Sequence, residues 1–67
     1  MKVKDIKRLV ERQTFRPFGV RLNNGERYTF KEARDVGAPR SYRMLVYLGV
    51  TEVVRIDTSS IVEIIEP

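Results

Sequence analysis

The segment from Phe15 to Gly25 constrains the fold more than any other part of the chain. It reads F-R-P-F-G-V-R-L and runs directly into N-N-G. Phe18, Val20 and Leu22 occupy alternate positions, which is the period of a strand with one buried face. The triplet 23–25 is a strong turn signal, and a second strand-like run follows it. The segment therefore predicts a β-hairpin early in the chain.

The length of the hairpin loop follows from which side chains it would bring together. A two-residue loop would pair an apolar residue with a charged one and mix the two faces of the hairpin. A three-residue loop pairs Val20 with Tyr28 and Phe18 with Phe30. It also puts Gly25 at the left-handed position of a type I turn with a bulge, where glycine is favoured. We therefore predict the three-residue loop.

This register sets Arg21 directly opposite Arg27 on the outer face of the hairpin. Like charges in that position destabilise a strand pair. Either an acidic neighbour, such as Glu26 or Glu32, relieves the repulsion, or an anionic ligand does. The arginine pair is therefore the first place to look for an anionic partner.

The remaining elements follow from hydrophobic periodicity. Residues 3–13 read as a helix, with an apolar stripe at Val3, Ile6, Leu9 and Val10. Residues 31–43 read as irregular, with one helical turn near 31–34, and Thr58-Ser59-Ser60 reads as a single 3₁₀ turn. The predicted strands are 16–22, 26–31, 43–48, 52–57 and 61–66.

The order of elements predicts an α+β, mostly β fold in one domain, residues 1–67. We expect an N-terminal helix followed by a five-stranded antiparallel small barrel of the SH3-like or Sm-like kind. Closing the sheet would remove most unpaired edges from a chain this short, which buries only about 60% of its unfolded surface. The alternative is a two-layer β structure with the helix packed on one face.

The Phe15-Arg16-Pro17-Phe18 motif also carries a family resemblance. The helix, this motif, the alternating strand, Gly25 and Tyr28 resemble a set of small uncharacterised bacterial proteins. The resemblance covers residues 3–30 and, more weakly, 56–66, whereas segment 31–43 departs from the pattern. It implies the same early fold and transfers no functional residue. The SH3-like and Sm-like comparison is an analogy of fold alone.

The composition argues against catalysis and against common cofactors. The chain contains neither cysteine nor histidine, which excludes thiolate and histidine zinc sites and the Ser-His and Cys-His catalytic pairs. Two carboxylate pairs, Glu32 with Asp35 and Asp57 with Glu63, are expected by chance because 33% of the residues are charged. We expect no enzyme activity, no cofactor and no metal.

The N-terminal segment 1–5 is charged and is followed by no apolar run of the length that a signal peptide needs. No stretch approaches the roughly 20 apolar residues of a membrane span. With no cysteine in the chain, we expect a cytoplasmic protein and no membrane partner.

Positive charge is concentrated in the first two thirds of the chain. Residues 1–43 hold twelve Lys/Arg and five Asp/Glu, whereas residues 44–67 hold one and four, and the whole chain carries +4. A basic protein with this asymmetry favours anionic partners, although a solvated surface is the ordinary explanation. The segment Pro39-Arg40-Ser41-Tyr42-Arg43 places basic residues around one aromatic, as a nucleic-acid contact requires. The candidate anion or nucleic-acid contacts are Arg21, Arg27, Lys31, Arg34, Arg40, Tyr42 and Arg43.

Strands 43–48 and 52–57 are apolar on both faces, so one of those faces needs a cover. The candidate interaction face is Leu45, Tyr47 and Val53, covered by a protein partner or by a second copy of the chain. Alternatively, the N-terminal helix covers it. The sequence therefore predicts a non-enzymatic binding or protein-interaction module that can self-associate, with nucleic-acid binding through a basic face as the alternative.

Overall fold

The computed structural model describes residues 3–66 and contains one helix and six strands. Helix α1 spans Val3–Val10, shorter than the expected 3–13, because after Glu11 the chain turns toward Phe15, which packs against the core. The strands are β1 Phe18–Leu22, β2 Arg27–Phe30, β3 Val36–Gly37, β4 Met44–Leu48, β5 Val53–Asp57 and β6 Ile61–Ile65. Two 3₁₀ turns, η1 Ala33–Asp35 and η2 Thr58–Ser60, complete the described elements.

The first sheet has the strand order β2-β1-β6 and confirms the predicted hairpin register. Phe18 pairs with Phe30 and Val20 with Tyr28 across β1 and β2. Gly25 has a φ of +91° and donates its N–H to the Leu22 carbonyl. The three-residue loop is therefore the one in the structure, because only glycine adopts that backbone conformation without strain.

The second sheet has the order β3-β4-β5 and contains a strand that the sequence did not predict. Val36 and Gly37 pair with Tyr47 and Val46 of β4, inside a segment expected to be irregular. Two residues are too few to show a hydrophobic period, so the pairing depends on β4 being in place. The expected helical turn is present as η1, shifted to Ala33–Asp35.

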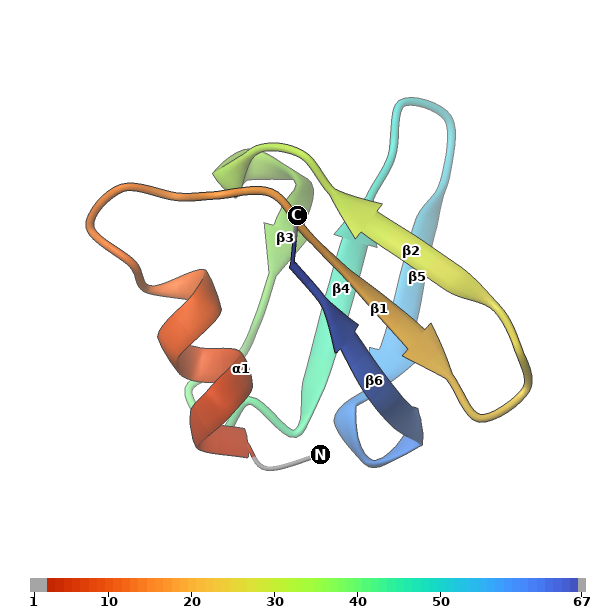
Figure 1. Cartoon of the computed structure of the whole chain (residues 1–67). Coiled ribbons are helices and arrows are strands. Elements are labelled where there is room, and N and C mark those ends of the chain that lie inside the picture. The colour runs from red at the N-terminus through yellow and green to blue at the C-terminus, as the bar shows by residue number, and fades with distance from the viewer. Residues whose placement is uncertain (1–2, 67) are drawn as a thin grey trace.

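The strands form two three-stranded antiparallel sheets and not the expected closed five-stranded barrel. Figure 1 shows β1, β2 and β6 crossing in front of β4 and β5. The 3₁₀ turn η2 carries the chain from β5 in one sheet to β6 in the other. The Thr58 N–H and hydroxyl both donate to the Arg43 carbonyl and hold this corner against β4. Such corners are how strands change sheets in a two-layer structure.

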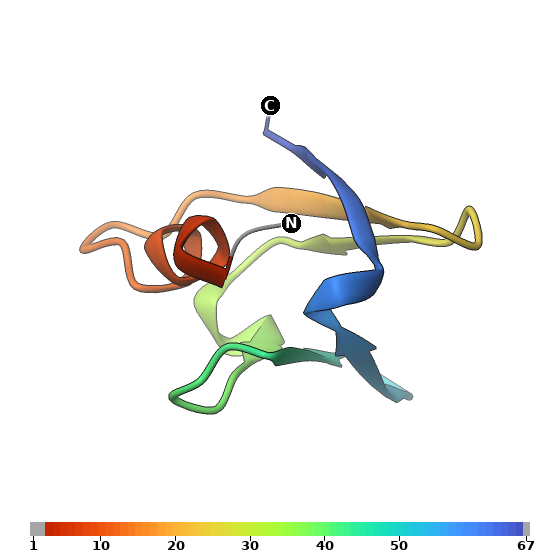
Figure 2. The same cartoon turned by 90° about the horizontal axis from the view of Figure 1, so that it is seen from below.

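The core lies between the two sheets and is completed by the helix. Ile6 and Leu9 of α1 are buried with Phe18 and Phe30 of the first sheet and Leu45 of the second. Figure 2 shows α1 at one side of the two layers, where it closes the space between them. An eight-residue helix is too short to be stable in isolation, so this docking stabilises it.

The predicted interaction face of Leu45, Tyr47 and Val53 does not exist as one surface. Leu45 is fully buried and Tyr47 packs against the core, whereas Val53 is 72% exposed. Val53 pairs with Leu48, and therefore lies on the outer face of β4 and β5. Within the described residues, the core shared with the first sheet covers the Leu45 side, and the outer face stays open.

Candidate functional site

A shallow hollow lies on the outer face of the first sheet, above Gly19. Gly19 sits between Thr29 of β2 and Ile65 of β6, and both neighbours carry side chains on that face. A Cβ on Gly19 would lie 3.7 Å from the Thr29 hydroxyl and 3.8 Å from the Ile65 Cβ. The hollow has a volume of about 280 Å³, with Pro17 and Arg27 also at its wall, and we call it the Gly19 hollow.

A second hollow lies beside β2, toward the turn between β4 and β5. It has a volume of about 420 Å³, and we call it the Lys31 hollow. Its lining combines two cations, Lys31 and Arg34, with one carboxylate, Asp35, and with apolar surface from Tyr47 and Val50. Arg34 forms an exposed ion pair with Glu32 at 2.6 Å, and exposed pairs of this kind stabilise a protein by only about 0–1 kcal/mol. Both cations therefore remain accessible to a ligand.

Thr29 lines both hollows, so they form one continuous surface across β2. We call this the β2 surface. Arg27 stands at one end and Lys31 at the other, and within residues 3–66 neither forms an ion pair. These cations are among the contacts predicted from the sequence, whereas Gly19 and Thr29 are not. A glycine inside a strand, where no side chain packs, is the signal that marks such a hollow.

Arg21 lies in the same row of the sheet but is neutralised by an acidic neighbour. It stands between Arg27 of β2 and Glu63 of β6. Its guanidinium donates to the Glu63 carboxylate at 2.8 Å. This hydrogen bond and the charge of Arg21 lower the pKa of Glu63, with a smaller contribution from Arg27. A neighbouring acid therefore relieves the Arg21–Arg27 repulsion, and the acid is Glu63.

The two acids named as candidates for that role have other partners. Glu26 accepts a hydrogen bond from the Tyr28 hydroxyl at 2.8 Å, which raises the pKa of Tyr28. Glu32 pairs with Arg34, and its N–H donates to the Asp35 carboxylate at the start of η1.

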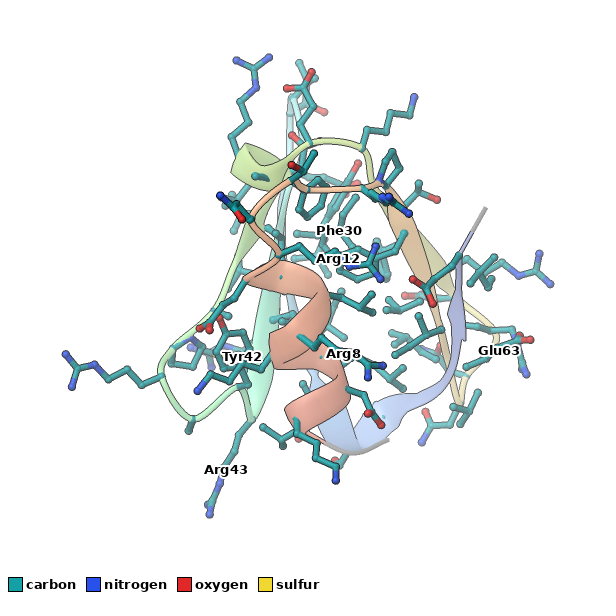
Figure 3. The ribbon with its side chains drawn as sticks, turned by 60° about the vertical axis from the view of Figure 1, so that its left-hand side comes forward. Arg8, Arg12, Phe30, Tyr42, Arg43 and Glu63 are labelled. Carbon is teal, nitrogen blue, oxygen red and sulfur yellow. The ribbon has the colours of Figure 1, made fainter. Side chains whose placement is uncertain are left out.

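Tyr42 is a core residue and not the exposed aromatic that the sequence suggested. Its side chain is only 6% exposed, and Figure 3 shows it against the side of α1. The Tyr42 hydroxyl donates to the Glu11 carboxylate at 2.8 Å, and its backbone adopts a φ of +53°. Its N–H donates to the Pro39 carbonyl, which closes the turn before β4. The turn therefore places the Tyr42 ring in the core, away from Arg40 and Arg43.

The buried phenol makes the protein sensitive to alkali. Burial, followed by the hydrogen bond to Glu11, raises the pKa of Tyr42 from 10.0 to about 12. A raised pKa means that the native state holds this proton more tightly than the unfolded state. The contribution of this proton to the free energy of unfolding is fully present below pH 10 and is lost as the pH rises toward 12. We expect urea midpoints to fall over this range, and to fall less in Tyr42→Phe, which lacks the proton. An equal fall in both proteins would contradict the assignment to Tyr42.

The remaining predicted cations do not join the β2 surface. Arg40 and Arg43 are exposed on the segment between β3 and β4. Figure 3 shows Arg43 extending away from the molecule, far from Glu63. Of the seven predicted contacts, the structure brings Arg27, Lys31 and Arg34 together around β2. It separates Arg40 and Arg43 from them, pairs Arg21 with an acid and buries Tyr42.

The second predicted carboxylate pair serves two different local structures. Asp57 caps η2, where it accepts hydrogen bonds from the backbone N–H and the hydroxyl of Ser59, and these bonds lower its pKa. Glu63 pairs with Arg21. Within residues 3–66, no three His, Cys, Asp or Glu side chains gather as a metal ion would require. In that same part of the chain, no helix has the length and apolar character needed to cross a membrane.

The β2 surface thus combines accessible cations with apolar hollows. Comparison with known proteins assigns no function to this surface. No protein-family model, curated protein or solved structure matches the chain. The resemblance of the Phe15–Phe18 motif to small bacterial proteins therefore stays a prediction.

Proposed function

We propose that the protein is a non-enzymatic binding module whose β2 surface takes an acidic segment of another protein. One observation carries this proposal. Two hollows meet at Thr29, and the cations that flank the meeting point, Arg27 and Lys31, form no ion pair within the described residues. Unpaired cations beside apolar surface favour a ligand that combines negative charge with apolar side chains.

The fold itself suggests a relationship of architecture alone. We propose that the two sheets are an open relative of the SH3-like and Sm-like small barrels, because a helix precedes the strands and a 3₁₀ turn precedes the last one. This remains an analogy of fold and carries no function. A cytoplasmic location, proposed from the composition, agrees with a module that works through protein contacts.

The test of the proposed function uses charge reversal with a matched control. The site variant is Lys31→Glu with Arg34→Glu, and the control is Arg40→Glu with Arg43→Glu, which changes the net charge equally. The probe is a fluorescein-labelled pool of acidic peptides, measured by anisotropy at low salt. We expect the site variant to bind about tenfold or more weakly and the control to bind like the parent protein, because reversal replaces attraction by repulsion. Equal loss in both variants would contradict a specific site.

Nucleic-acid binding is the second candidate, now at a different place. Tyr42, the aromatic expected to contact a nucleic acid, is buried. Tyr47, however, lines the Lys31 hollow together with Lys31 and Arg34. An aromatic between cations is the arrangement that stacks a base next to a phosphate. A labelled single-stranded oligonucleotide in the same assay decides between the candidates. Tight binding that falls steeply with salt, with no peptide binding, would replace the first proposal.

Self-association stays part of the proposal because apolar side chains are exposed on the second sheet. Leu48 and Val53 lie opposite each other on its outer face, and Val50 is fully exposed in the turn between them. We expect sedimentation equilibrium to give a mass that rises with concentration above the 7.8 kDa of one chain. A mass of one chain at all concentrations would remove self-association and leave the β2 surface as the binding site.

A further inference from the structure

The β2 strand has a free edge beside the Lys31 hollow. In the first sheet β2 has one neighbour, β1, so its other side pairs with no strand in the described part of the chain. Thr29 and Lys31 line the hollow on that side, and Tyr47 and Val50 form the opposite wall. An unpaired strand edge presents backbone N–H and C=O groups that an added strand can bind.

The side chains along β2 set the charge of the strand that would fit. Arg27 and Thr29 point to the outer face, since they lie opposite Arg21 and Gly19 of β1. Lys31 continues this alternation one residue beyond the end of β2. The outer face of β2 therefore carries two cations, Arg27 and Lys31, with the Thr29 hydroxyl between them. Residues directly opposite one another in neighbouring strands interact, so acidic side chains fit opposite Arg27 and Lys31.

A second copy of the chain is the wrong occupant for this edge. Antiparallel pairing of two β2 strands about Thr29 would set Arg27 of each copy against Lys31 of the other, and like charges directly opposite are destabilising. The edge of β5 shows no comparable preference, because its outward row of Val53, Arg55 and Asp57 mixes apolar, basic and acidic groups.

We propose that the ligand adds to the free edge of β2 as an extra strand, with acidic side chains opposite Arg27 and Lys31. This inference rests on the proposed function of the β2 surface. The residue opposite Thr29 lies between the two acids on the outer face. The two residues that alternate with these three lie opposite Tyr28 and Phe30, on the face where the Tyr47 ring packs beside both aromatic rings, so apolar side chains fit there. The expected five-residue ligand sequence is therefore acidic, apolar, threonine, apolar, acidic. Because this sequence is symmetric, it fits both parallel and antiparallel addition to β2.

The test compares two labelled peptides of identical composition. Glu-Val-Thr-Val-Glu, flanked by serines, places its acids in the outward row, whereas Val-Glu-Thr-Glu-Val in the same flanks places them inward. We expect the first peptide to bind about tenfold more tightly, because two charge pairs are gained. We also expect Lys31→Glu to remove this preference and Arg40→Glu to retain it.

Backbone methylation tests strand addition itself. In a strand that pairs on one side, only alternate N–H groups face the partner. N-methylation of one alternate set in Glu-Val-Thr-Val-Glu should therefore abolish binding, and methylation of the other set should leave it intact. Equal tolerance of both sets, or equal affinity of the two parent peptides, would overturn strand addition while acidic-ligand binding survives. If neither peptide binds and the acidic pool does not bind either, the proposed function fails as well.

Discussion

Replacing Phe30 by alanine is expected to leave most of the protein unfolded at room temperature. The Phe30 side chain has no exposed surface, and its ring centroid lies 5.0 Å from that of Phe18 and 5.9 Å from that of Tyr47. Truncating a buried phenylalanine costs about 3–5 kcal/mol through lost transfer free energy and the cavity left behind. The core of a domain this small rarely supplies more than about 3–5 kcal/mol. The loss therefore equals most of the available stability.

The neighbouring Thr29 provides the matched control for this experiment. It belongs to the same strand but points to the outer face, so Thr29→Ala keeps the strand and touches no core contact. Surface substitutions usually change stability by about 0.5 kcal/mol or less. Urea unfolding followed by circular dichroism should separate the two variants clearly. Similar midpoints for Phe30→Ala and Thr29→Ala would show that the core is not where the structure places it.

Replacing Tyr42 by alanine is expected to cost nearly as much as the Phe30 change. The ring is almost fully buried, packs with the core and is held by the turn that begins at Pro39. Removing it leaves a cavity near the helix, at a cost of about 3–5 kcal/mol. Tyr42→Phe keeps the ring and removes only the hydrogen bond to Glu11. Because that carboxylate is exposed and regains water, the smaller change should cost about 1 kcal/mol.

A double-mutant cycle with Glu11→Ala, which removes the acceptor, isolates the hydrogen bond between the two residues. The two single changes remove the same contact, so the double variant should be little less stable than either single variant. Thermal unfolding of the four proteins measures the coupling. Additive effects would show that the hydroxyl does not bind Glu11, and equal losses in Tyr42→Phe and Tyr42→Ala would show that the buried ring contributes nothing.

The hairpin was predictable because its information is local. Alternation at Phe18, Val20 and Leu22 defines a face, and Gly25 defines the loop, within a few residues of one another. The two cations that flank the β2 surface follow from the same register, since the positions of Arg27 and Lys31 are set once the loop length is known. The other predicted elements were also recognisable, with ends that differ by at most three residues.

The failures share a different cause, which is that pairing and packing with other segments decide which way a residue faces, and a local pattern does not encode those contacts. Strand β3 forms because Val36 and Gly37 pair with β4, and two residues are too few to show a strand-like alternation in the sequence. Val53 was grouped with Leu45 and Tyr47, but its pairing with Leu48 turns it to the opposite face. Tyr42 between two basic residues looked like an exposed platform, yet a single left-handed residue rotates it into the core.

By itself the sequence determined the three-residue loop, the Arg21–Arg27 opposition and the row of cations on β2. These depend on strand period and on the conformational freedom of one glycine, which act over neighbouring residues. Only the tertiary structure decided that Glu63 neutralises Arg21, that Thr29 joins two hollows, and that the strands divide into two sheets. The physical reason is that these features arise when β6 and β4 pack beside segments more than ten residues away. A local pattern encodes which face of an element is buried, but it does not encode which residues pack against that face.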